Sequence, residues 1–138
     1  MSRRSAWRAW ALAGVLLLAA LACSVTVTTA HFENVRLYRE ADRASTAARA
    51  FSAGETIFCL ADLKDAEGQV PVRAEWVRLP KEQADPPRTT VVQQELVASD
   101  GLVIFEAPPP NGSWTPGPHR VELYVDNHRT ATLDFTIR

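Results

Sequence analysis

The chain has 138 residues, a length typical of one domain, with 46% hydrophobic and 22% charged residues. Its formal net charge is −1. Removing the three arginines of the first ten residues leaves 12 basic residues against 16 acidic ones, a net charge of −4. Binding to a phosphate backbone needs a clustered basic face, so this balance excludes nucleic acid as an expected partner.

The first 22 residues have the pattern of a secretory signal peptide. Arg3, Arg4 and Arg8 form a basic start, and an apolar stretch of 14 residues follows at 9–22. A membrane-spanning helix needs about 20 residues, so we predict a helical signal peptide over 1–22 that is cleaved. The alternative is an uncleaved inner-membrane signal anchor, whose helix would have to continue to residue 27.

The segment AALAC, which ends at Cys23, resembles the lipobox of bacterial lipoproteins. The resemblance implies cleavage between Ala22 and Cys23, acyl chains on Cys23, and, because Ser24 follows, an outer-membrane location facing the periplasm. Two features leave open whether the lipoprotein signal peptidase or the ordinary signal peptidase cleaves the chain. Leu is commonest three residues before the cysteine, where this chain has Ala20, and Ala20-Leu21-Ala22 also fits an ordinary signal peptidase site. Cleavage by that enzyme predicts a secreted protein.

Residues 23–31 are interpreted as a lipid-attached spacer, with a first edge strand as the alternative for its polar, β-prone part. Beyond the spacer, short segments alternate apolar and polar residues, with turn residues such as Ser99-Asp100-Gly101 and Asp126-Asn127-His128 between them. We expect a loop at 39–51, and the proline-rich connections 79–88 and 107–118 should lie outside central strands. This pattern predicts an all-β sandwich over 32–138. The expected strands are 31–40, 55–63, 70–79, 89–98, 102–107, 119–125 and 129–138.

Four positions carry a resemblance to immunoglobulin-like modules. That fold has a Cys on one strand, a Trp on the next and a Tyr corner two residues before a second Cys. Here Cys59 and Trp76 match, while His119 stands at the Tyr position and Val121 at the second Cys. The stretch from Trp114 to Ile137 is also similar to the closing hairpin of immunoglobulin-like modules in bacterial envelope proteins. The resemblance implies a sandwich of about seven strands, with Cys59, Trp76, His119 and Val121 in its core and no disulfide between the two sheets.

No catalytic or metal-binding constellation emerges from the sequence. His119 opens one expected strand and His128 lies at the far end of the same hairpin, more than about 20 Å away at 3.3 Å per residue, so they cannot share a metal. The acidic group Asp62, Asp65 and Glu67 lacks the spacing of a calcium loop and fits a solvated turn. We therefore expect a protein that is not an enzyme and has no cofactor.

The sequence thus predicts a lipid-anchored, non-catalytic protein of the bacterial cell envelope. It would contact the membrane through acyl chains on Cys23 and bind another envelope protein, as an interaction or assembly module. The alternative is a module that binds a glycan or small ligand. An exposed aromatic shelf, such as Phe58 beside Tyr124 on one open face, would favour that alternative; Phe58, Tyr124 and Val77 are all expected on outward faces.

Overall fold

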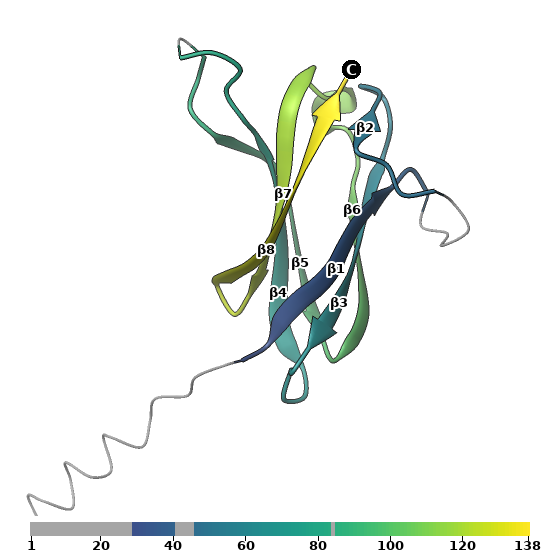
Figure 1. Cartoon of the computed structure of the whole chain (residues 1–138), viewed down its shortest axis with the longest axis vertical. Helices are drawn as coiled ribbons and strands as arrows, with labels where there is room; N and C mark the ends of the chain where they lie inside the picture. The colour runs from purple at the N-terminus through teal and green to yellow at the C-terminus, as the bar shows by residue number, and fades with distance from the viewer. Residues whose placement is uncertain (1–28, 41–45, 84) are drawn as a thin grey trace, which may run out of the picture.

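The chain folds into two β-sheets packed face to face (Figure 1). A computed structural model describes residues 29–40, 46–83 and 85–138. The predicted signal peptide, Cys23 and most of the spacer lie outside these residues. The strands are β1 (His31–Tyr38), β2 (Ala50–Phe51), β3 (Ile57–Lys64), β4 (Val70–Arg78), β5 (Thr89–Ala98), β6 (Gly101–Ala107), β7 (Gly117–Val125) and β8 (His128–Ile137), with one 3-10 turn at Pro110–Gly112.

One sheet has three strands in the order β1-β3-β6, and the other has five in the order β2-β8-β7-β4-β5. Neighbouring strands are antiparallel, except that β2 pairs in parallel with the end of β8. The prediction of an all-β sandwich is therefore confirmed. The described residues form eight strands rather than about seven, because the end of the expected loop 39–51 forms β2, which is too short to produce an alternating pattern.

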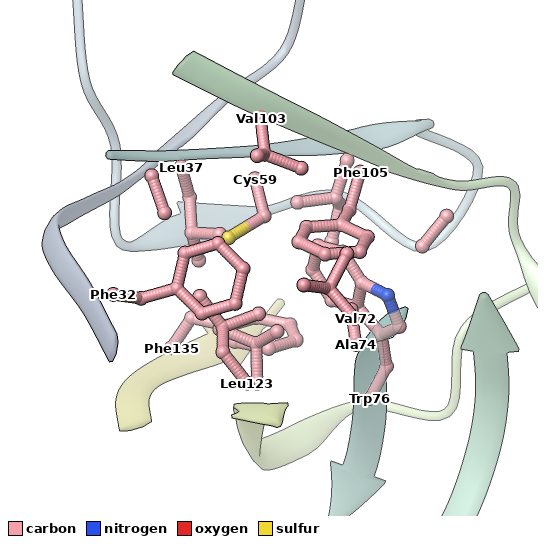
Figure 2. Packing of buried hydrophobic residues seen from close by; sticks show 14 of the residues in the cluster. Phe32, Leu37, Cys59, Val72, Ala74, Trp76, Val103, Phe105, Leu123 and Phe135 are labelled. Atoms are coloured by element: carbon pink, nitrogen blue, oxygen red, sulfur yellow. The ribbon is translucent and has the colours of Figure 1, made fainter. Parts of the chain in front are cut away.

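The core lies between the sheets and is built from alternate residues of each strand (Figure 2). On β4, for example, Val72, Ala74 and Trp76 are buried, as their spacing predicts for one face of a pleated strand. Phe32 and Phe105, which come from the three-stranded sheet, meet edge to face with ring centroids 5.9 Å apart. The core of the sandwich thus draws its aromatic residues from both sheets.

Strand ends differ in detail from the expected boundaries. β1 begins at His31, and Ala30 already packs in the core, so the ordered sandwich includes residues assigned to the spacer. Pro118 was expected outside a central strand but is the second residue of β7. Its carbonyl accepts a hydrogen bond from the Leu79 amide, and it pairs with Thr136 on β8. A proline is tolerated there because it lies near the strand's first residue, where few ladder bonds need its missing N–H.

Candidate functional site

The four positions that resemble the immunoglobulin pattern all lie in the interior. Cys59, Trp76 and Val121 have no exposed surface, and His119 is 1% exposed. Trp76 and Val121 are directly paired across β4 and β7. These residues shape the core and face no solvent, so none of them can bind a ligand in the folded chain. The lipid-attachment and cleavage residues, Cys23 and Ala22, lie outside the described residues.

His119 belongs to an aromatic cluster at the start of β7. Its ring stacks on Phe135, with centroids 5.4 Å apart, and meets Trp114 edge to face at 5.8 Å. Its Nδ1 donates to the backbone carbonyl of Gly117 at 3.0 Å. Burial lowers the pKa of His119 below its ordinary value. The residue is therefore a neutral member of the core, and its hydrogen bond fixes the position of Gly117, the first residue of β7.

Cys59 is a free, buried thiol whose sulfur points into the core (Figure 2). Burial in apolar surroundings raises the pKa of this thiol to about 12. The thiolate is the reactive form of cysteine, so Cys59 is chemically inert at neutral pH.

The three aromatic and apolar residues expected on outward faces have different environments. Phe58 lies on β3 and Tyr124 on β7, which belong to different sheets, so the two side chains do not form a common shelf. Both are partly exposed. Val77 alternates with the core residues of β4, as expected, but it is fully buried rather than partly exposed.

The outer face of the five-stranded sheet carries a charged network that the sequence did not reveal. Glu122 on β7 is completely buried, although it alternates with core residues and points away from the core. Two arginines hold its carboxylate: Arg88, which precedes β5, and Arg129 on β8, whose Nη1 lies 3.1 Å from Oε2. Tyr124 also donates its hydroxyl to Glu122 Oε1 at 3.2 Å. The carboxylate is therefore buried but saturated with donors, as a buried charge requires.

The network continues across β4. The Arg73 guanidinium lies over the Tyr124 ring, 4.2 Å from its centroid, a cation–π contact. Arg73 also lies 3.6 Å from Glu75 and donates to Asn127 Oδ1 at 2.8 Å. We call the residues Arg73, Glu75, Arg88, Glu122, Tyr124 and Arg129 the Glu122 network. It carries three positive and two negative charges and fixes the position of the Tyr124 ring.

A pocket of about 340 Å³ opens beside this network. Its lining combines the aromatic ring, hydrogen-bonding groups and apolar surface: Pro71, Val72, Arg73, Glu95, Leu96, Val97, Tyr124, Asp126 and Asn127. The volume is at the lower end of the range for small-ligand sites, about 300–1,000 Å³. Its polar lining includes two carboxylates, Glu95 and Asp126, and the guanidinium of Arg73.

The acidic turn after β3 gives no metal site in the described part of the chain, where no group of three or more His, Cys, Asp or Glu side chains is arranged to hold an ion. Asp62 instead accepts a hydrogen bond from Asn34 Nδ2 at 3.0 Å. The Asp65 carboxylate lies 3.8 Å from His31. Within the described residues, no helix is long and apolar enough to cross a membrane.

Comparison with known proteins gives the fold but no family. No protein-family model matches the sequence, and no curated protein matches it significantly. Among solved structures, an immunoglobulin-like protein of Pseudomonas aeruginosa is similar, with a TM-score of 0.51 and 13% identity. The match covers 80% of this chain and 98% of that protein.

Two larger proteins contain a part of similar shape. The Pseudomonas fluorescens alkylpurine DNA glycosylase AlkC, solved with DNA containing an abasic-site analogue, matches with a TM-score of 0.54 and 13% identity. A β-glucosidase involved in saponin metabolism from intestinal bacteria matches with a TM-score of 0.54 and 17% identity. The matches cover 80% and 83% of this chain, but only 31% and 17% of those proteins. At such identities the likeness concerns the fold alone, and it is that of an immunoglobulin-like β-sandwich.

Proposed function

We propose that the chain is a lipid-anchored protein of the bacterial cell envelope, whose immunoglobulin-like sandwich binds another envelope protein. The observation that carries this proposal is the position of Cys23, directly after the 14-residue apolar stretch and the small residue Ala22. An acyl chain contributes about 0.8 kcal/mol per buried CH₂, and two or more chains make a stable anchor. The anchor would place the sandwich at the membrane surface, in the periplasm if Ser24 directs the protein to the outer membrane.

The burial of Cys59 supports this use of Cys23. A disulfide between the two cysteines would require Cys23 to enter the core between the sheets, where Cys59 has no exposed surface. Disulfide bonding needs Cα atoms within about 7 Å of each other. Cys59, the other cysteine of the sequence, is thus buried away from a disulfide partner, which is consistent with a lipid on the sulfur of Cys23.

The anchor is tested by growing cells with labelled palmitate and comparing wild type, Cys23→Ser and Cys59→Ala. We expect label in the wild type and in Cys59→Ala, and we expect Cys23→Ser to lose both the label and membrane attachment. Cys59→Ala is the matched control, because it removes the other cysteine without touching the leader. The proposal fails if the wild type is never labelled, or if Cys23→Ser remains in membranes as a signal anchor would.

A second candidate function is binding of a small ligand or glycan, and the pocket beside Tyr124 is the observation that favours it. An aromatic ring and two carboxylates at one site suit a ligand rich in C–H faces and hydroxyls. NMR titration with chitotetraose is expected to shift signals around the pocket in the wild type and not in Tyr124→Ala. Phe58→Ala, on the opposite sheet, should behave like the wild type. Shifts that persist in Tyr124→Ala would rule out the pocket as the site.

A further inference from the structure

The outermost strand of the five-stranded sheet, β5, has an open edge. It runs for ten residues, from Thr89 to Ala98, and pairs only with β4. Its single charged residue is Glu95, and it contains no Lys, Arg or Pro. Proteins usually protect a long edge strand with such residues, because its unpaired N–H and C=O groups can pair with another strand. On β5 that protection is missing, and Val97 is 66% exposed.

The other outer strands of the described sandwich are shorter than β5, and β1 is also irregular. β1 is irregular between Glu33 and Arg36, where Asn34 adopts a φ of 53°. β2 has only two residues. On β6, the backbone amide of Glu106 donates a hydrogen bond at 2.7 Å to the side chain of Gln94 on β5. One backbone donor of the β6 edge is therefore already occupied. The irregularity of β5 itself lies near its start, at Val91, so the part from residue 92 onward pairs regularly with β4.

We propose that two copies of this chain pair along β5, antiparallel, with Gln94 on the twofold axis. In this register Gln93 lies opposite Glu95 of the second copy, an amide facing a carboxylate. Val92 lies opposite Leu96 of the second copy. Opposite residues of an antiparallel pair share a face, so each of these contacts joins side chains that can touch.

Shifting the pairing by one residue in either direction brings less compatible side chains opposite each other. A shift in one direction places Glu95 opposite Glu95 of the second copy, and like charges directly opposite destabilise a pair of strands. A shift in the other direction centres the pair on Gln93. It sets the apolar side chain of Val92 opposite the amide side chain of Gln94 of the second copy. Self-complementarity in one register is what an isologous interface requires, and it is the reason to assign a second copy rather than a foreign strand as the occupant.

The pairing would join two five-stranded sheets into one continuous sheet and leave the outer faces free. Twofold symmetry also keeps the starts of the two sandwiches, at Thr29, at equal heights along the axis. Two copies tethered to one membrane can therefore form this pair, although the inference rests on the sandwich and does not depend on the tether.

The test uses the full chain with cysteines placed on β5. Gln93→Cys/Glu95→Cys is expected to give a disulfide-linked dimer after mild oxidation, measured on a non-reducing gel against the wild-type baseline. Each single variant should give little, because a residue and its symmetry mate are then diagonal rather than opposite. Absence of a dimer from the double variant, or equal yields from the single variants, would overturn the proposal.

A second comparison keeps the result specific to this edge. Val97→Lys in the double-cysteine background places a charge on the edge and should weaken association about tenfold, equivalent to about 1.4 kcal/mol. Ile104→Lys, at the exposed hydrophobic residue on β6, is the matched control and should leave the dimer yield unchanged. An equal loss in both variants, or no loss with Val97→Lys, would contradict pairing along β5.

Discussion

Replacing Glu122 by Gln tests whether the buried carboxylate stabilises the sandwich. The substitution keeps the size of the side chain but removes the charge that faces Arg88 and Arg129. Hydrogen bonds to charged groups contribute about 1.5–3 kcal/mol each. The arginine side chains are 42% and 54% exposed, so water solvates them once the carboxylate is gone, and the lower part of the range applies. We expect the free energy of unfolding to fall by about 2–3 kcal/mol.

Chemical denaturation with urea measures this loss directly, and thermal unfolding should show a fall in Tm of about 8–12 °C for a domain of this size. Asp134→Asn is the matched control on the same sheet face. Asp134 is 63% exposed where it pairs with Arg120, so its loss should cost less than about 0.5 kcal/mol. If Glu122→Gln costs no more than this control, solvent screens the network and its burial has no energetic consequence.

Three further predictions concern the core and its edges. The free energy of unfolding should decrease as pH falls below 6.5, by at most about 1.4 kcal/mol per pH unit. The reason is that His119 binds a proton in the unfolded state but stays neutral in the folded state, where its pKa is lowered. The slope is read in a His31→Asn background, since the raised pKa of His31 acts in the opposite direction, and it should vanish in His119→Phe; a slope that survives there comes from other groups. Cys59, with a pKa of about 12, should react with a thiol reagent at pH 8 only after denaturant is added, and rapid reaction of the native chain would contradict its burial. Gly117→Ala should cost about 1–2 kcal/mol in urea unfolding, because Gly117 has a φ of 129°, whereas Gly54→Ala, with no atom near the added Cβ, should cost little; equal effects would show that strain at Gly117 is unimportant.

The strands were predictable from the sequence because their signal is local. Val72, Ala74 and Trp76 alternate with polar residues, and each pleated strand shows one face to the core. The two tight turns around Gly101 and Asn127 likewise follow from residue types that favour left-handed backbone, and both residues have positive φ in the structure. β2 was missed because two residues cannot show a period.

The outer sheet face was not predictable, because its burial depends on partners distant in the sequence. Alternation along β7 places Glu122 on the solvent side. Arg129 lies close by across the β7–β8 turn, but nothing local indicates that Arg88 also covers the carboxylate. Val77 also alternates outward and is nevertheless buried. The pocket beside Tyr124 also forms from three separate strands and a turn, so only the folded chain reveals it.

The intact mass of the protein extracted from bacterial membranes tests the central proposal most directly. We expect a chain that begins at Cys23 and carries the added mass of a diacylglycerol and a further acyl group. Tandem fragmentation should place the added mass on Cys23, while Cys59 remains a free thiol. An unmodified chain beginning at Cys23, or a full-length chain that retains residues 1–22, would contradict the lipid anchor.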